Sequence, residues 1–194
     1  MPQPAPNAQS TVQTTVDKAA LRKALAAARA QLDPACKAEW DRVIGARMAA
    51  WWRANAGMAD PLGVYWPLRG EPDLSATYAA LATLGVQLAL PVVLARECAL
   101  GFAAWTPGEA MVKDAMGVAV PAELRMIARP PALLIPCLGF TAQGYRLGYG
   151  GGYYDRTLAS TPRPLTVGVA YACQQAQFAS APHDVALDLV ITEA

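Results

Sequence analysis

Short apolar runs alternate with helical patterns through most of this chain, and this alternation restricts its fold more than any other feature. The predicted strands are residues 62–66, 87–91, 102–105, 133–137, 166–171 and 187–192, with a helical pattern at 74–84 between the first two. Such alternation is typical of βαβ units, in which helices cover both faces of a largely parallel sheet. Ligands of such sheets bind at the carboxyl ends of the strands.

Two helices are predicted before the first strand. Asp17 can cap a helix that runs to about residue 32, and Asp33 followed by Pro34 is a second helix start signal. Residues 1–16 show no amphipathic pattern, so we expect a disordered tail there. With 194 residues in all, the rest of the chain, 17–194, is expected to form a single domain.

Composition and charge exclude several classes of protein. The net charge is +1, so the chain lacks the general electrostatic field that nucleic-acid and membrane-surface binding use. Its apolar runs fall short of the ~20 residues that a membrane helix needs. The four cysteines are dispersed, which argues against a zinc site or a disulfide framework and favours a reducing cytoplasm. Any anion site is therefore expected to be local.

The most informative motif is the glycine-rich segment RLGYGGGYYD at 146–155. Each glycine costs roughly 0.5–1 kcal/mol relative to alanine, so three in succession need a reason, and close approach of the backbone to a ligand is one. Successive N–H groups at a helix start can form an anion nest suited to phosphate. Arg146 would add a bidentate cation and Asp155 an oxygen ligand for Mg²⁺. The alternative, a packed glycine turn, leaves Arg146 and Asp155 unexplained.

Cations also share one edge of the first predicted helix. At ~100° per residue, Lys18, Arg22 and Arg29 lie within about 40° of one another, beside an apolar stripe. Such an edge can bind phosphates, but a solvated helix face is the usual explanation of such a run of cations. Spacing alone leaves both interpretations open.

A third candidate follows the first predicted strand, in YWPLRGE at 65–71. Trp66 can stack on a flat heterocycle, and Glu71 can accept hydrogen bonds from its N–H edge. A core tryptophan and a surface acid are the alternative. His183, the only histidine, is expected to be structural or solvated, whereas Asp184 is a candidate second acid near a metal.

These segments together resemble the 5-formyltetrahydrofolate cyclo-ligase family, whose members are also called 5,10-methenyltetrahydrofolate synthetases. The similar segments are KAALRKALAAAR, GVYWPLRGEPDL, LPVV, LIPCLGFTAQGYRLGYGGGYYDR, VGVAYACQ and PHDVALDLVITE. The resemblance implies a three-layer α/β/α sandwich with a largely parallel sheet, related to the ribose-phosphate isomerase and coenzyme A transferase group. It also implies closure of 5-formyltetrahydrofolate to 5,10-methenyltetrahydrofolate with ATP and Mg²⁺, and release of ADP and phosphate.

The resemblance also implies roles for individual residues. The ATP-binding residues are Lys18, Arg22, Arg146, Leu147, Gly148, Tyr149, Gly150, Gly151, Gly152, Tyr153 and Tyr154. The folate-binding residues are Trp66, Glu71, Trp105, Tyr149, Gly150, Gly151, Gly152 and Tyr153. Arg146 and Asp155 are the catalytic residues, and Asp155 and Asp184 the metal ligands. Two positions depart from many relatives, which have acids where this chain has Val120 and Thr141.

The chemistry implied needs no protein nucleophile, and the sequence shows no Ser/His/Asp or Cys/His arrangement. Positioning and charge stabilisation would then carry catalysis. Two other classes stay open: a folate- or nucleotide-binding protein without turnover, and a sugar-phosphate isomerase, which needs no ATP. The expected partners are ATP and 5-formyltetrahydrofolate, its polyglutamylated forms included, but neither nucleic acid nor a membrane. A monomer is expected, with a dimer left open.

Overall fold

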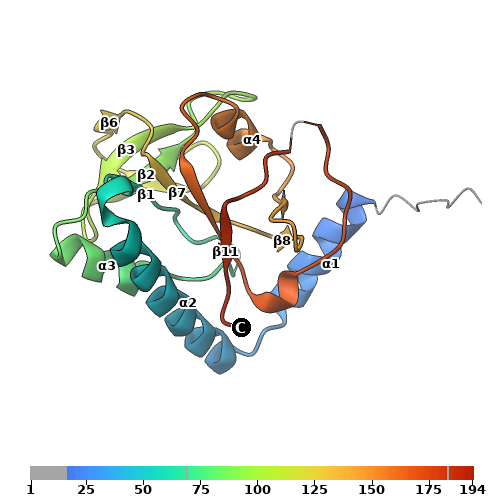
Figure 1. The fold of residues 1–194 in the computed structure, drawn as a ribbon. Helices are drawn as coiled ribbons and strands as arrows, with labels where there is room; N and C mark the ends of the chain where they lie inside the picture. Colours follow the sequence, from blue (N-terminus) through green and yellow to red (C-terminus); the bar gives the residue numbers. More distant parts are fainter. Residues whose placement is uncertain (1–16, 69, 183) are drawn as a thin grey trace, which may run out of the picture.

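Helices and strands alternate along the chain much as the sequence predicts. The computed structural model describes residues 17–68, 70–182 and 184–194, so the predicted tail at 1–16 and His183 lie outside the described residues (Figure 1). The helices are α1 (Lys18–Ala30), α2 (Pro34–Asn55), α3 (Ser75–Thr83) and α4 (Tyr153–Leu158), with 3₁₀ turns η1 (Ala56–Met58) and η2 (Ala172–Gln174). The strands are β1 (Leu62–Gly63), β2 (Leu88–Val92), β3 (Gly101–Trp105), β4 (Met111–Lys113), β5 (Ala119–Pro121), β6 (Met126–Ile127), β7 (Ala132–Pro136), β8 (Gly139–Phe140), β9 (Arg146–Leu147), β10 (Leu165–Val169) and β11 (Leu189–Ile191).

Both N-terminal helices begin at the predicted caps. The Asp17 carboxylate accepts a hydrogen bond from the Ala19 N–H (2.9 Å), and the Asp33 carboxylate accepts one from the Cys36 N–H (3.0 Å). Pro34 occupies the first helical position, where its missing N–H costs nothing. These side-chain caps satisfy N–H groups that a helix start otherwise leaves without partners.

The central sheet is parallel over most of its width. In the described chain its strand order is β11-β10-β7-β1-β2-β3-β6, with parallel pairs from β11 to β2 and antiparallel pairs from β2 to β6. The largely parallel sheet is therefore confirmed, with one modification at the β3 edge. β3 is antiparallel because the connection 93–100 is shorter than the dozen or so residues that a parallel crossover needs.

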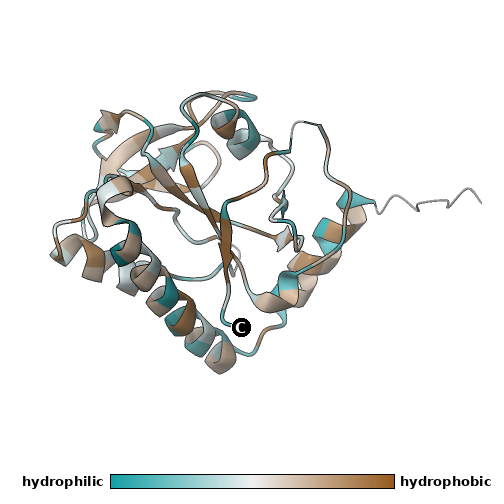
Figure 2. Ribbon diagram, in the orientation of Figure 1, coloured by the Kyte–Doolittle hydropathy of each residue, from teal (hydrophilic) through white to brown (hydrophobic). Residues whose placement is uncertain are grey.

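The sheet has a hydrophobic cluster on each face, because neighbouring residues of a strand point to opposite sides. Leu134 of β7 belongs to the cluster that contains Ile44 of α2 and Tyr78 of α3. Leu133 belongs to the opposite cluster, which contains Leu158 of α4. Figure 1 shows α2 and α3 on one side of the sheet and α4 on the other, and Figure 2 shows hydrophobic residues concentrated on the central strands. The three-layer arrangement is thus confirmed; the relation to the isomerase and transferase group stays a prediction.

The chain reverses its direction of travel across the sheet between β1 and β7. From β1 it proceeds to β2 on one side, whereas β7, β10 and β11 follow one another on the other side. Such a switch point opens a crevice at the carboxyl ends of the two strands. Residues 64–71 follow β1 there, and residues 137–152 follow β7. Both candidate ligand-binding segments therefore start side by side, at the carboxyl ends of two neighbouring strands.

Helix α1 packs against the β8–β9 hairpin rather than against either of the two main hydrophobic clusters. Leu25 of α1 forms a small separate cluster with Leu138 and with Leu147 of β9. A Cβ at Gly139 of β8 would lie 2.6 Å from the Leu25 Cδ1, which shows how closely helix and hairpin approach. Figure 1 shows α1 next to β8, away from α2 and α3.

Within the described residues, no helix is long and apolar enough to cross a membrane.

Replacing Leu25 with alanine should loosen α1 because Leu25 is central to this small cluster. We expect the free energy of unfolding to fall by about 2–4 kcal/mol, measured by urea denaturation. Amide hydrogen exchange should accelerate in α1 more than in α2. Leu84→Ala is the control, since Leu84 is 63% exposed and its loss should cost about 0.5 kcal/mol or less. Equal effects of the two substitutions would contradict this account of α1 docking.

Candidate active site

The glycine loop, residues 148–152, extends from the β8–β9 hairpin to the start of α4. Gly150 and Gly152 have φ values of 93° and 65°, a left-handed conformation that disfavours other residues. At Gly151 a Cβ would lie 2.9 Å from the Tyr153 ring. Backbone conformation and close packing therefore account for the three successive glycines.

Carbonyl groups of this loop are held by arginines, while its N–H groups remain available. The Arg22 Nε donates to the Gly148 carbonyl (2.8 Å), and the Arg156 Nη2 donates to the Gly151 carbonyl (2.5 Å). Among the described residues, the N–H groups of Gly150, Gly151 and Gly152 donate no hydrogen bond. Exposed backbone N–H groups of this kind can bind an anion. The helix that follows, α4, is only six residues long, so its dipole adds little to them.

Arg146 and Asp155 face each other across the base of the loop. The Asp155 Oδ1 accepts hydrogen bonds from both Nη1 (3.0 Å) and Nη2 (2.8 Å) of Arg146. The Arg146 side chain is only 6% exposed and its guanidinium lies 5.5 Å from the centre of the Tyr154 ring. Burial and the charge of Glu71 raise the pKa of Tyr154 far above its usual value, so this phenol stays neutral. The predicted phosphate-binding cation and the predicted metal ligand are thus each other's partners here.

Each of the three cations on one edge of α1 reaches a distant part of the chain. Lys18 forms an ion pair with Asp184 (2.9 Å), whose carboxylate also accepts the Ala181 N–H (2.8 Å). Arg22 holds the Gly148 carbonyl, and Arg29 donates to the Tyr149 hydroxyl. The interpretation of this edge as a solvated helix face is therefore wrong, since all three cations make tertiary contacts.

Glu71 is buried at the end of the segment that follows β1, with 3% of its surface exposed. Its Oε2 accepts the Leu68 N–H (2.9 Å), and its Oε1 accepts the Tyr149 hydroxyl (3.0 Å). The surface-acid interpretation is therefore wrong. The bond to Tyr149 joins the segment after β1 to the glycine loop after β7.

Trp66 and Trp105 form an edge-to-face pair, and Trp66 belongs to the same segment after β1 as Glu71. Their ring centres are 6.1 Å apart, and Trp105 makes a second such contact with Tyr78, also at 6.1 Å. Trp66 is partly exposed, whereas Trp105 is buried in the core. The Trp105 indole N–H has no hydrogen-bond partner among the described residues. Trp66 is therefore the one of the two that presents surface to a ligand.

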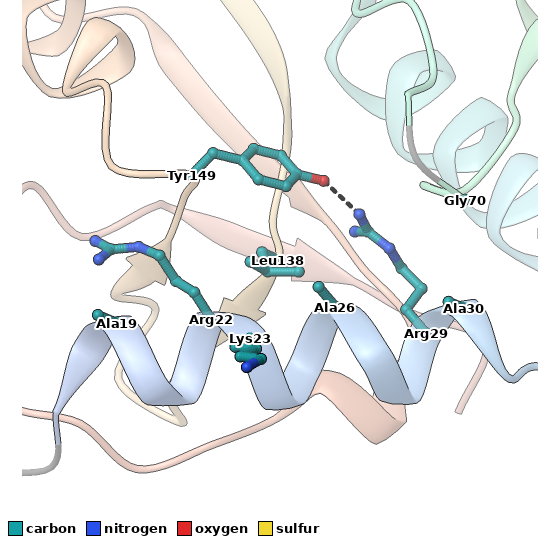
Figure 3. Close-up of a pocket in the computed structure, with 9 residues that line it drawn as sticks. All are labelled: Ala19, Arg22, Lys23, Ala26, Arg29, Ala30, Gly70, Leu138 and Tyr149. Atoms are coloured by element: carbon teal, nitrogen blue, oxygen red, sulfur yellow. Dashed lines mark hydrogen bonds between the residues drawn. The ribbon is translucent and has the colours of Figure 1, made fainter.

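Two hollows flank the glycine loop. The first, about 610 Å³, lies between α1 and the loop and is lined by Arg22, Arg29, Gly70 and Tyr149 among others. Figure 3 shows Tyr149 extending over α1 to Arg29, with Arg22 on its other side. The second, about 640 Å³, is lined by Gly150, Gly151, Gly152, Asp155, Arg156 and Pro182 among others. The loop thus separates a hollow beside the Glu71 turn from one beside Asp155.

Asp155 and Asp184 are the two candidate carboxylate ligands for a metal ion at the second hollow. Asp155 lines it, and Asp184 lies between Pro182 and Val185, which also line it. No group of three or more His, Cys, Asp or Glu side chains with metal-ligand geometry exists within residues 17–68, 70–182 and 184–194. Mg²⁺ is commonly held by one or two carboxylates together with substrate phosphates, so these two acids fit a phosphate-dependent site.

No motif in the sequence predicts a role for Arg156, and none predicts an individual role for Arg29. Arg156 holds the Gly151 carbonyl and also donates from Nε to the Cys98 carbonyl (3.3 Å). Its contact is local, since Gly151 lies only five residues before it, but it depends on the conformation of the glycine loop. No local signal marks the partner of Arg29.

The two departures from the family pattern are occupied by structural contacts. Val120 packs against Val92 and Ala103 in a small cluster. The Thr141 hydroxyl accepts the Tyr145 N–H (3.2 Å) in the turn between β8 and β9. Both residues therefore stabilise local structure in the ligand-free protein.

Comparison with known proteins gives one consistent result. The model of the 5-formyltetrahydrofolate cyclo-ligase family matches residues 14–193. A 5-formyltetrahydrofolate cyclo-ligase from Mycoplasma genitalium is 27% identical over 177 residues, 91% of this chain and 98% of that protein. A solved 5,10-methenyltetrahydrofolate synthetase from Mycoplasma pneumoniae has a TM-score of 0.76 at 27% identity, covering 92% of this chain and 99% of that one. One from Aquifex aeolicus has a TM-score of 0.77 at 26% identity, covering 91% and 89%.

Asp155→Asn should destabilise the protein, because it leaves the nearly buried Arg146 without its ionic partner. We expect the free energy of unfolding, measured by urea denaturation without Mg²⁺, to fall by roughly 1–3 kcal/mol. Glu123→Gln is the control, since it breaks an exposed pair with Arg125 (3.6 Å) and should change the same quantity by about 0.5 kcal/mol or less. An unchanged stability of Asp155→Asn would show that the ion pair contributes nothing.

Proposed function

This chain belongs to the 5-formyltetrahydrofolate cyclo-ligase family, and we propose that it closes 5-formyltetrahydrofolate to 5,10-methenyltetrahydrofolate in an ATP- and Mg²⁺-dependent reaction that releases ADP and phosphate. One observation carries this proposal: the buried Glu71, the unused N–H groups of the glycine loop and the cations of α1 meet at the β1–β7 switch point. A carboxylate suits the N–H edge of a pterin, and the loop suits phosphates. The two ligands that the reaction needs thus find complementary groups in one place.

We assign ATP to the glycine loop and to Lys18, Arg22 and Arg146. The N–H groups of residues 150–152 would bind phosphate oxygens, with the Arg22 guanidinium close by: a Cβ at Gly150 would lie 3.6 Å from its Cζ. In the ligand-free protein Lys18 and Arg146 are held by Asp184 and Asp155. Binding of phosphate and of a cation would exchange these two ion pairs for charge pairs with the ligands.

We assign the folate to the hollow beside Glu71. The carboxylate would accept hydrogen bonds from the pterin N–H edge, and Trp66 would pack against the bound ring, with Trp105 fixing Trp66 from behind. Tyr149 lies at the rim of the same hollow and contacts Glu71 directly. A buried carboxylate facing a ring without donors is costly, so this arrangement should select folates over other heterocycles.

Asp155 and Asp184 would hold Mg²⁺ together with phosphate oxygens. When bound, the ion would neutralise charge that develops on the transferred phosphoryl group. The protein contributes two partly exposed carboxylates, whose side chains are 22% and 14% exposed.

The proposed reaction has three changes of bonding. The formyl oxygen of the substrate attacks the γ-phosphorus of ATP, and the bond to the ADP oxygen breaks. N10 then attacks the activated formyl carbon, and the phosphorylated oxygen leaves as phosphate. The N10 proton is lost, so the product is the methenyl cation. The residues of the site orient the two substrates and stabilise charge, as in other phosphoryl transfers. We expect the protein to act in the cytoplasm as a monomer, on soluble folates rather than on nucleic acid or a membrane.

The decisive test is formation of the methenyl chromophore by the purified protein. With 5-formyltetrahydrofolate, ATP and Mg²⁺, absorbance of the methenyl product should rise over many turnovers, with one ADP released per product. Omission of ATP, or addition of excess EDTA, should abolish the signal. Folate binding without turnover would overturn the proposal in favour of a binding protein, and activity on a sugar phosphate without ATP would favour an isomerase.

Glu71→Gln should weaken folate binding selectively. Loss of a charged acceptor is worth about 1.5–3 kcal/mol, so we expect the dissociation constant for 5-formyltetrahydrofolate to rise roughly ten- to a hundred-fold. ATP affinity, titrated separately, should change less than about three-fold. Glu123→Gln, at an exposed side chain, serves again as the control for the loss of one carboxylate. Unchanged folate affinity in Glu71→Gln would show that the pterin binds elsewhere.

A further inference from the structure

We propose that Arg29 is a positioning residue for folate: it fixes the Tyr149 hydroxyl on the Glu71 carboxylate and thereby orients the acceptor that binds the pterin. This inference rests on the proposed function, because it assumes that Glu71 binds the folate. Arg29 differs from Lys18 and Arg22 in its partner, since those two contact Asp184 and the Gly148 carbonyl.

The position of Arg29 suits an internal rather than a surface role. It lies in the last turn of α1 and only 3% of its surface is exposed, which is rare for a charged side chain without a specific partner. Its guanidinium donates to the Tyr149 hydroxyl and lies 5.8 Å from the centre of that ring. A Cβ at Gly70 would lie 4.0 Å from the Arg29 Cγ, so its stem also packs under the turn that precedes Glu71.

The donor and the acceptor in the bonds of Tyr149 to Arg29 and to Glu71 follow from the chemistry of the three side chains. A guanidinium only donates, so the Tyr149 oxygen is the acceptor of the bond from Arg29. The single phenol proton is then left for the Glu71 Oε1 at 3.0 Å. Burial and the negative charge of Glu71 raise the pKa of Tyr149, which keeps that proton on the phenol. The result is a chain of bonds with a fixed direction, from Arg29 through Tyr149 to Glu71.

This chain of bonds fixes a carboxylate from both sides. The Leu68 N–H holds the Oε2 of Glu71, and the Tyr149 hydroxyl holds the Oε1. Tyr149 itself is 42% exposed, so packing alone does not immobilise its ring. Loss of the Arg29 donors removes a contact that orients the phenol and, through it, the Oε1 of Glu71. Folate affinity should then fall. ATP affinity should change less, because the N–H groups that we assign to ATP lie farther along the loop.

The test is a double-mutant cycle with 5-formyltetrahydrofolate as the probe, measured by isothermal titration calorimetry. Arg29→Met keeps the apolar stem and removes the donors, and Tyr149→Phe removes the hydroxyl. We expect each to raise the folate dissociation constant about ten-fold, and the double variant to bind no more weakly than the weaker single variant. Independent losses that multiply in the double variant would overturn the proposal, as would unchanged folate affinity in Tyr149→Phe.

Two controls separate positioning from general damage to the fold. Arg53→Met removes an exposed cation from α2 and should leave both affinities within about two-fold. In Arg29→Met the KM for ATP should change less than about three-fold while the KM for folate rises, because a merely structural loss would move both. If Arg29→Met does not fold, Arg29→Leu, which also lacks donors, replaces it in the cycle.

The wild-type protein decides whether a failure belongs to this inference or to the proposed function. If it forms the methenyl chromophore and the losses in the cycle multiply, only the role of Arg29 is refuted. If it does not bind 5-formyltetrahydrofolate, the proposed function fails. The bond chain is then tested in ligand-free protein, where the melting temperature of the double variant should equal that of the less stable single variant.

Discussion

The parallel pairing of β1 with β7 brings together the two segments on which the candidate site is built. Leu62 pairs with Ala132 and Gly63 with Leu133, and the segments carrying Glu71 and the glycine loop leave the sheet directly beyond this pair. The approach is close: a Cβ at Gly63 would lie 2.4 Å from a methyl carbon of Leu133. Because the switch point lies between β1 and β7, the two segments share one crevice. About seventy residues separate these strands in sequence.

Charge pairing is the second feature that holds the candidate site together. Lys18 and Arg146 form ion pairs with Asp184 and Asp155, whereas Arg29 donates to the neutral Tyr149 hydroxyl; all three partners are candidate ligand-binding groups. The two ion pairs compensate partly buried charges. An anionic ligand and its cation offer each member of a pair a new partner of opposite charge. Under the proposed function, ligand binding would exchange these ion pairs for pairs with the ligands.

Helix α1 is the element on which this exchange depends. It is fixed by the small cluster around Leu25, and its three cations reach the glycine loop, Tyr149 and the segment that holds Asp184. Its anchoring is local compared with α2 and α3, whose residues belong to the largest cluster. Ligands that engage both α1 and the loop would add to this limited apolar contact. Binding should therefore stabilise α1 more than the rest of the fold.

The sequence by itself determined the features that depend on neighbours along the chain. Asp17 and the Asp33–Pro34 pair mark the two helix starts because a cap acts on N–H groups two or three residues away. The glycine loop was predictable in the same way, since its φ values are a local property. Only the tertiary structure decided that Trp105 is buried while its neighbour Trp66 is partly exposed, and that Arg29 contacts Tyr149 across 120 positions of sequence. These depend on which strands pair and how closely helices pack, and residue spacing carries no information about either.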